Sequence, residues 1–291
     1  MPETSQQTQA KVDKRKSPSG KILYGAIVAE AEEELDRPSS GLFWSGLAAG
    51  LSMGFSIFTM ALIHSHLPHE KWAPLLVSFG YSLGFLVVIL GRQQLFTENT
   101  LTPILPLLRR PSVFVFFNVL RLWIVVFVAN MIGACAMALV LAKCPVLPEE
   151  ARKSLIELSM QGMHKPFGTM VLRAIYAGWL IALIVWLLPF AEAARIWVII
   201  IITYVVSLAE LPHSVAGAVE AFITSWHGDA SWPDALFGYI APTLIGNAIG
   251  GVTLVAALNH AQVLASGESL DTAHQQSQQS QQSQPKDTGL P

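Results

Sequence analysis

The chain has 291 residues, of which 52% are hydrophobic and only 13% are charged. A soluble domain carries about 25% charged residues, so this balance excludes an ordinary soluble protein and predicts a membrane protein. The formal net charge of −2 offers no basic surface for nucleic acid. The two cysteines provide neither a disulfide framework nor a CxxC metal spacing.

The chain starts with a polar and basic stretch, residues 1–21, which lacks the apolar core of a signal peptide. We expect this stretch to be a disordered cytoplasmic tail. In the next stretch, ILYGAIVAEAEEEL, apolar residues recur at helical spacing, so residues 22–40 are expected to hold an amphipathic helix at the membrane interface. A continuation of the disordered tail is the alternative interpretation.

Six apolar stretches are long enough to cross a bilayer, which takes about 20 helical residues. They predict an all-α membrane domain over residues 41–265, with spans at 42–64, 73–108, 112–142, 167–189, 194–225 and 233–264. Six spans place both termini on one side, and the basic residues before the first span favour the cytoplasm. Basic residues in the 143–166 loop on the opposite side weaken this orientation. Residues 266–291 form a Gln/Ser-rich tract, expected to be a disordered cytoplasmic tail.

Two of the predicted spans are interrupted by polar residues, glycine and proline. The first interruption reads GRQQLFTENTLTPILP over 91–106, and the second lies at 207–217 within SLAELPHSVAGAVEAF. Non-helical backbone at membrane depth is tolerated only inside protein or beside a water-filled cavity, because unpaired backbone groups facing lipid are too costly. We therefore interpret the two interruptions as the two halves of a permeation site.

Short motifs indicate an internal repeat. The third span contains Asn130 and Gly133 in an N-x-I-G motif, and the sixth contains Asn247 and Gly250 in the same motif, 117 positions later. The same offset moves Phe96–Thr97 onto His213–Ser214, within the second interruption. Repeats of three spans must have inverted orientation. Chance similarity among apolar segments is the alternative. Small residues every fourth position predict close helix packing in spans one, three and six.

Several stretches resemble the formate/nitrite transporter family: YSLGFLVVILGRQQLFTENT, RLWIVVFVANMIGA, HSVAGA and PTLIGNAIGGV. The RQQLFTENT form is similar to a little-characterised bacterial inner-membrane branch of that family. The resemblance covers roughly residues 25–265. It implies an aquaporin-like fold of two inverted three-helix repeats with helices 2 and 5 broken, and a homopentamer with one pore in each protomer. It also implies passage of small monovalent anions or their acids, such as formate, nitrite, hydrosulfide or short carboxylates.

The resemblance also assigns pore residues by position. It places an aromatic and an apolar residue of the cytoplasm-to-pore constriction at Tyr81 and Phe85, and the loop threonine at Thr97. It places the pore histidine, its serine neighbour, the apolar residue of the fifth helix and the asparagine of the last helix at His213, Ser214, Val206 and Asn247. The best candidate for the lysine that attracts anions before the fourth helix is Lys165, where the alignment can slip by two residues.

The chain departs from the family pattern around the expected pore. Pro212 replaces the glutamate before the histidine, Gly217 replaces an asparagine, and Trp179 replaces another in the fourth helix. Glu98 stands where a small residue is usual, and a direct substrate role is open to it. Glu98 and Arg92 are costly in a span, so we expect them to pair with each other or with loop backbone. The departures leave the substrate open.

The chemistry of His213 supports a transport function. Moving a bare anion into a low dielectric is costly, and an imidazole supplies a proton or a hydrogen-bond donor in the useful pH range. Tyr81, Phe85 and Val206 would strip hydration from the solute and exclude larger ones. We therefore predict a multi-pass channel or transporter of the bacterial inner membrane, proton-linked through His213, with no cofactor and no bound metal.

Two other classes of function remain open. Glu210 and His213 form an E-x-x-H spacing, which would suit an intramembrane metal-binding protein or enzyme, although no catalytic set accompanies it. A channel for neutral solutes is the other alternative. The HSHLPHE stretch at 64–70 has metal-binding residue types, but we expect its histidines to be solvated in a short exposed loop.

Overall fold

A computed structural model describes residues 20–163 and 165–265 of the protein. The predicted C-terminal tail and most of the N-terminal tail lie outside the described residues. The elements in chain order are α2 Gly20–Asp36, α3 Ser39–Ser65, α4 Ala73–Leu90, η1 Glu98–Thr100, α5 Ile104–Arg109, α6 Val113–Lys143, α7 Glu149–Gln161, α8 Phe167–Leu187, η2 Leu188–Phe190, η3 Glu192–Ala194, α9 Arg195–Leu208, α10 Ala216–His227, η4 Asp234–Ile240, α11 Ala241–Ile249, η5 Gly250–Ala257 and α12 Leu258–Ala265. Within the described ranges all regular structure is helical, which confirms the all-α prediction.

Five of the helical stretches in the described part of the chain are long and apolar enough to cross a membrane. They are Ser39–Ser65, Ala73–Leu90, Val113–Lys143, Phe167–Phe190 and Asp234–Ala265, and Arg195–Leu208 is a shorter apolar helix. Prolines stand directly before several helices, at Pro38, Pro148 and Pro166, in extended backbone. There the missing N–H removes no helical hydrogen bond. In the last span, η4 and η5 are π-helical turns that flank α11.

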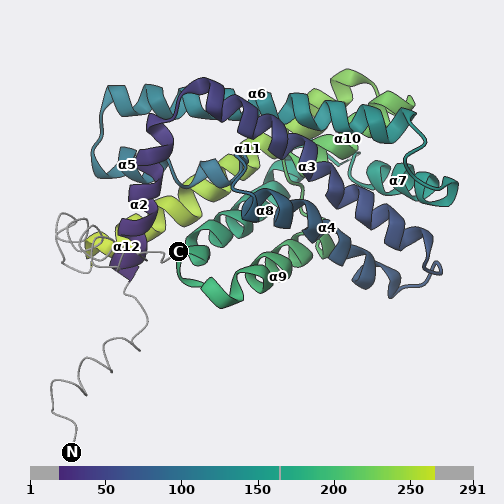
Figure 1. Ribbon diagram of the computed structural model, residues 1–291, viewed down its shortest axis with the longest axis horizontal. Coiled ribbons are helices and arrows are strands. Elements are labelled where there is room, and N and C mark those ends of the chain that lie inside the picture. Colours follow the sequence, from purple (N-terminus) through teal and green to yellow (C-terminus); the bar gives the residue numbers. More distant parts are fainter. Residues whose placement is uncertain (1–19, 164, 266–291) are drawn as a thin grey trace, which may run out of the picture.

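Glycines bring two pairs of helices into close contact, α3 with α6 and α11 with α8 (Figure 1). A Cβ at Gly50 would overlap the backbone oxygen of Asn130, and a Cβ at Gly178 would overlap that of Asn247. Gly133 and Gly250 are equally confined, against the backbones of α3 and α8. These contacts confirm the predicted role of the small residues in packing, since any side chain would push the backbones apart.

α2 lies against the rest of the molecule along one buried face. Tyr24, Ile27, Val28 and Ala31 are buried, and the helix contacts α5 and α12 (Figure 1). The Tyr24 hydroxyl lies 2.7 Å from His260 Nδ1. Burial raises the pKa of Tyr24 to about 12. The helix thus spans the stretch in which the apolar spacing predicted one.

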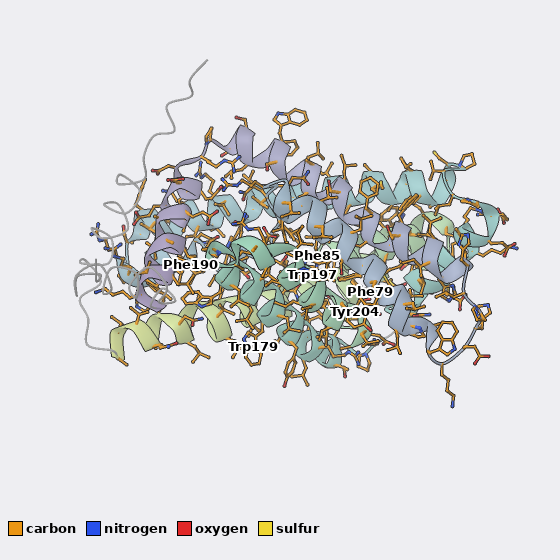
Figure 2. All side chains as sticks on the ribbon, turned by 60° about the horizontal axis from the view of Figure 1, so that its bottom comes forward. Phe79, Phe85, Trp179, Phe190, Trp197 and Tyr204 are labelled. Atoms are coloured by element: carbon orange, nitrogen blue, oxygen red, sulfur yellow. The ribbon has the colours of Figure 1, made fainter. Side chains whose placement is uncertain are left out.

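Large apolar side chains cover the outside of the bundle. Trp197 of α9 is 65% exposed and Phe79 of α4 is 51% exposed. The rings of Phe79 and Tyr204 stack with centroids 4.4 Å apart, so α4 and α9 meet at this surface. Figure 2 labels these aromatic side chains together with Phe85, which is fully buried. A surface of this kind suits lipid or a neighbouring chain rather than water.

Candidate functional site

The first half of the site is the loop between α4 and α5, residues 91–103. α4 closes with Arg92 at φ 50°, a left-handed conformation in which glycine is the usual residue. The Gln93 N–H donates to the carbonyl of Val88 at 2.9 Å, which satisfies an orphan acceptor of the helix end. The chain leaves α4 in a defined direction because this hydrogen bond fixes the turn.

The second half is the loop between α9 and α10, residues 209–215. Here Glu210 has φ 48°, and the Leu211 N–H donates to the carbonyl of Val206 at 2.9 Å. The two helix ends therefore have the same backbone conformation and the same hydrogen bond. In each case a residue with a side chain takes the strained position, at a cost on the order of 1–3 kcal/mol.

Asn130 of α6 holds the first loop in place. Its Oδ1 accepts from the Phe96 N–H at 2.9 Å, and its Nδ2 donates to the carbonyls of Gly46 and Gln94 at 2.7 and 2.9 Å. Asn130 is fully buried. One side chain thus satisfies two loop backbone groups, the Phe96 N–H and the Gln94 carbonyl, and attaches them to α3 through the Gly46 carbonyl, which stabilises the non-helical loop inside the bundle.

Asn247 of α11 holds the second loop in the same way. Its Oδ1 accepts from the Ser214 N–H at 2.8 Å, and its Nδ2 donates to the carbonyls of Ala174 and Pro212 at 2.8 and 3.1 Å. Asn247 was predicted as a pore residue. Its amide atoms are committed to backbone, so the geometry gives it a positioning role.

The two clamps correct the predicted register of the loops by one residue. The shared hydrogen bond makes Phe96 equivalent to Ser214, and Gln94 equivalent to Pro212. The sequence offset had placed Phe96 on His213. The offset found from the asparagines does not carry over, because one residue fewer separates the loop from the asparagine in the second half.

His213 connects the two loops. Its Nε2 lies 2.7 Å from Thr97 Oγ1, and its Nδ1 accepts from the N–H groups of Val215 and Ala216 at 3.3 and 3.1 Å. Those amides are at the start of α10. Because Nδ1 accepts two hydrogen bonds, the proton of the neutral ring sits on Nε2 and is donated to Thr97. The Phe85 ring packs edge-on against the imidazole, with centroids 5.0 Å apart.

A cavity of about 100 Å³ reaches His213 from the side of α7. Of the predicted site residues, it brings together Tyr81, Val206, His213 and Lys165. Thr97, Phe85, Ser214 and Asn247 are buried behind the histidine rather than in the cavity wall. Trp179, one of the departures from the family pattern, does not line this cavity and is half-buried on α8 (Figure 2).

The cavity places Tyr81 close to α7. The resemblance placed Tyr81 and Phe85 at a cytoplasmic constriction, whereas the cavity that contains Tyr81 is bounded by Leu158 and Gln161 of α7. α7 belongs to the 143–166 loop, which the sequence placed on the opposite side from the termini. Tyr81 is in the middle of α4, and its side chain lines that cavity.

Lys165 and Arg173 surround the end of α9. Lys165 Nζ lies 3.0 Å from Glu210 Oε2, and an Arg173 nitrogen donates to the carbonyls of Ala209 and Glu210 at 2.7 and 3.1 Å. Cations are favourable at this helix terminus because its carbonyls carry partial negative charge. Glu210 therefore turns toward Lys165 while His213 points toward Thr97, and the E-x-x-H pair does not converge on a common metal position.

Sequence reasoning missed two residues of the cavity, Glu220 and Tyr239, and named Gly217 as a departure from the family pattern near the pore. A Cβ at Gly217 would overlap the end of the Tyr239 side chain, so any other residue here requires that ring to move. Glu220 lies on α10, seven residues after His213 of the preceding loop. A charged residue within the apolar run AGAVEAFITSW was the available signal for Glu220, whereas nothing in the sequence links Tyr239 to Gly217.

Buried polar atoms without a partner lie next to the Thr97–His213 pair. Glu98 Oε1 and Ser214 Oγ have no hydrogen-bond partner among the described residues. The expected ion pair of Glu98 with Arg92 does not form in this part of the chain; Arg92 is exposed at the helix end, whereas Glu98 Oε1 is buried in the loop. Unsatisfied buried groups are rare in proteins and call for a water or ligand that visits the site.

Known proteins of one family match this chain over most of its length. A family model described as formate/nitrite transporter matches residues 21–261. The chain is 37% identical over 253 residues to the inner membrane protein YfdC of Escherichia coli (strain K12), covering 87% of this chain and 82% of that protein. It is 26% identical over 216 residues to the formate channel BtFdhC of Bacillus thuringiensis, covering 71% of this chain and 80% of that protein.

Solved structures show the same fold. A channel described as an FNT family ion channel superposes with a TM-score of 0.72 at 18% identity, covering 81% of this chain and 96% of that one. A pentameric formate channel with formate bound superposes with a TM-score of 0.68 at 17% identity, covering 78% of this chain and 98% of that one. The family match over most of the chain and the identity to YfdC confirm the resemblance seen in the motifs: the chain is a membrane protein that belongs to the formate/nitrite transporter family, and is therefore a transporter or channel rather than an enzyme.

Proposed function

We propose that this protein passes small monovalent anions or their conjugate acids across the bacterial inner membrane, with formate, nitrite, hydrosulfide and short carboxylates as the substrate class. The observation that carries the proposal is the position of His213. It is 1% exposed, its Nε2–H is directed at the opposite loop, and a cavity with a lysine in its wall leads to it. The formate channel among the relatives agrees with this substrate class.

The proposed architecture has six membrane crossings in two inverted repeats, with both termini in the cytoplasm. α4 with α5 forms the second crossing, and α9 with α10 forms the fifth. Support comes from the matching helix ends and asparagine clamps of the two loops. The assembly is a homopentamer with one passage in each protomer, as in the pentameric formate channel whose fold it shares. Its exposed apolar surface would then be covered by lipid and by neighbouring protomers.

In the proposed mechanism an anion first enters the cavity beside Lys165. The ammonium attracts it, and the low-dielectric walls focus that attraction. Lys165 is already paired with Glu210 at 3.0 Å, so the anion competes with an exposed carboxylate for the ammonium. Glu220 in the same cavity opposes the anion whenever it is ionised, so the charge balance of these three groups sets the rate of entry.

The anion then reaches His213 and replaces Thr97 Oγ1 as the acceptor of the Nε2–H. Protonation at Nδ1 would break the hydrogen bonds from Val215 and Ala216 and would place a cation at the positive end of α10. The imidazole therefore acts as a neutral donor that holds the anion while a hydronium ion, arriving through cavity water, transfers a proton to it and leaves a water molecule behind. The neutral acid passes Phe85 and Val206 at far lower cost than the bare anion. Proton linkage in this scheme means that acid crosses, so flux rises as pH falls.

The test is stopped-flow flux of formate into proteoliposomes over a range of pH, with His213→Asn as the informative variant. Asparagine at this position keeps an oxygen to accept from the start of α10 and an amide to donate, but it cannot titrate. We expect His213→Asn to conduct with the same direction of pH dependence as the wild type. The matched control is His227→Ala, which removes an exposed histidine far along α10 that pairs with Asp229.

Two results would count against the proposal. If His213→Asn passed anion at a rate independent of pH, the imidazole itself would carry the proton. If wild-type liposomes passed uncharged solutes equally well at every pH and no formate, the protein would be a neutral-solute channel.

A further inference from the structure

Three metal-binding side chains meet on the side of the molecule where α3, the α3–α4 loop and α7 come together. His64 is in the last turn of α3, His69 is in the loop that follows, and Glu157 is on α7. One ligand atom from each lies within 4.8 Å of the other two. The sequence had suggested solvated histidines with Glu70 nearby, and the fold instead supplies a carboxylate from a distant helix.

The spacing of these atoms suits a transition-metal ion. Zinc binds histidine nitrogen and carboxylate oxygen at about 2.0–2.2 Å, so two ligand atoms on one tetrahedral ion lie about 3.4 Å apart. His69 and Glu157 are exposed, and their side chains can close the remaining distance by rotation. Two imidazoles and a carboxylate favour Zn²⁺, with Cu²⁺ and Ni²⁺ as chemically similar competitors, over Mg²⁺ or Ca²⁺.

A buried serine fixes the orientation of the first histidine. Ser154 Oγ lies 2.9 Å from His64 Nδ1, and Ser154 is 6% exposed. When the serine accepts the Nδ1 proton, the Nε2 lone pair is free for an ion, which is the usual support behind a metal-bound histidine. Ser154 is one turn before Glu157 on α7, so the support and the carboxylate ligand are on the same side of that helix.

The neighbouring histidine of the loop takes no part in the cluster. His66 Nδ1 lies 2.8 Å from the carbonyl of Leu62 and 3.2 Å from Ser65 Oγ. Its ring is thereby held against the end of α3. The rings of His64 and His69, in contrast, lie 5.5 Å apart at 69°. His66 is thus a matched control of the same chemistry in the same loop.

We propose that His64, His69 and Glu157 bind one Zn²⁺ ion per protomer, with water at the fourth position, and that the ion ties α7 to the α3–α4 loop. This link affects transport because Leu158, directly after Glu157, and Gln161, one turn later in α7, line the cavity that leads to His213. Bound zinc restricts this wall and lowers anion flux. The flux part of the inference rests on the proposed function, whereas zinc binding stands apart from it.

The binding test uses untagged full-length protein, stripped with a chelator, and titration with Zn²⁺ by calorimetry. We expect one ion per protomer, and an affinity lowered at least about tenfold in His64→Ala, His69→Ala and Glu157→Gln, each of which removes a direct ligand. Ser154→Ala is expected to lower it less, and His66→Ala to leave it unchanged. Size-exclusion profiles and unfolding temperatures verify that each variant is folded. Equal affinity in wild type and in the His64/His69/Glu157 triple variant would overturn the site.

The flux test compares formate uptake with and without Zn²⁺ in wild type and in His69→Ala. We expect zinc to slow the wild type at least about threefold and to leave His69→Ala unaffected, with zinc-free rates equal in the two proteins. Zinc binding without any change in wild-type flux would overturn the link to transport. Absence of formate flux in zinc-free wild type would instead overturn the proposed function, and calorimetry would still decide the metal site.

Discussion

The loop between α4 and α5 and the loop between α9 and α10 have the same backbone hydrogen-bond pattern but different side chains. Each begins at a left-handed residue and is held by a buried asparagine through three backbone hydrogen bonds. After the clamped amide, the second loop enters α10 almost at once, so that amides at the helix start reach His213. The first loop continues through η1 before α5 begins.

Because of this difference, the two loops contribute different groups to the site. The second loop supplies a hydrogen-bond donor whose tautomer is fixed by a helix terminus. The first supplies the acceptor Thr97 and attaches to the rest of the fold: Gln94 Nε2 donates to Glu34 of α2 at 2.8 Å, and Trp123 Nε1 donates to the Asn99 carbonyl at 2.8 Å. The left-handed residue and the asparagine hydrogen bonds, present in both loops, thus stabilise non-helical backbone inside the bundle. The side chains between these positions determine the chemistry of each loop.

The largest effect is expected where the two loops meet. His213→Ala removes the donor toward the anion and should lower formate flux about 10- to 100-fold, the range corresponding to a hydrogen bond to a charged group. Thr97→Val keeps the shape but removes the acceptor that orients the ring, and should lower flux less. Thr97→Ser is the control and should retain most of it. Stopped-flow uptake at fixed pH measures all three; equal losses in Thr97→Ser and Thr97→Val would contradict a hydrogen-bonding role for Thr97.

Substitutions of the two asparagines test whether the two loops are held by the same hydrogen-bond pattern. Asn130→Ala and Asn247→Ala each leave one N–H and one carbonyl of the loop without their partner, so each should lower the free energy of unfolding by about 2 kcal/mol or more. Thermal unfolding in detergent measures the loss. Asn118→Ala, a half-buried position on the same helix as Asn130, should change it by less than about 0.5 kcal/mol. A large loss at one clamp and none at the other would show that the two loops are not equivalent.

The long helices and both asparagines could be predicted from the sequence. Apolar stretches of spanning length located the long helices, and the repeated N-x-I-G motif identified both asparagines, because these features are local. The register of the loops was wrong by one residue, since a motif in a helix does not fix the length of the loop that it clamps. Glu220 and Tyr239 were missed because their role arises from contacts across the cavity. The pairing of His64 with Glu157 is equally tertiary.

A change in the charge of the cavity is expected to have a smaller effect on formate uptake. In the pH range where it is ionised, Glu220 places a negative charge in the space that an anion must enter, so Glu220→Gln should raise formate uptake there about three- to tenfold at low ionic strength. The gain should shrink as salt is added, because counterions screen the attraction to Lys165. Uptake at two ionic strengths measures this dependence. Glu150→Gln, at an exposed position of α7 that does not line the cavity, is the control for removal of an acid. A fall in uptake at low salt would show that the Glu220 carboxylate assists the anion.

The smallest effect is expected at the left-handed residues. Glycine in place of Arg92 relieves steric strain, but it also loses more backbone entropy on folding. The free energy of unfolding should therefore rise by only about 0.5–1 kcal/mol. Glu210→Gly relieves the same strain but also removes the carboxylate that pairs with Lys165 at 3.0 Å. That pair is partly exposed, with 63% of the Glu210 side chain accessible, so its loss subtracts little. Glu210→Gln separates the two contributions, because it removes the charge and keeps the strain. If the two helix ends are equivalent, Arg92→Gly will match the difference between Glu210→Gly and Glu210→Gln in thermal unfolding. A rise at only one position would mean that one helix end relaxes its strain through neighbours that the other lacks.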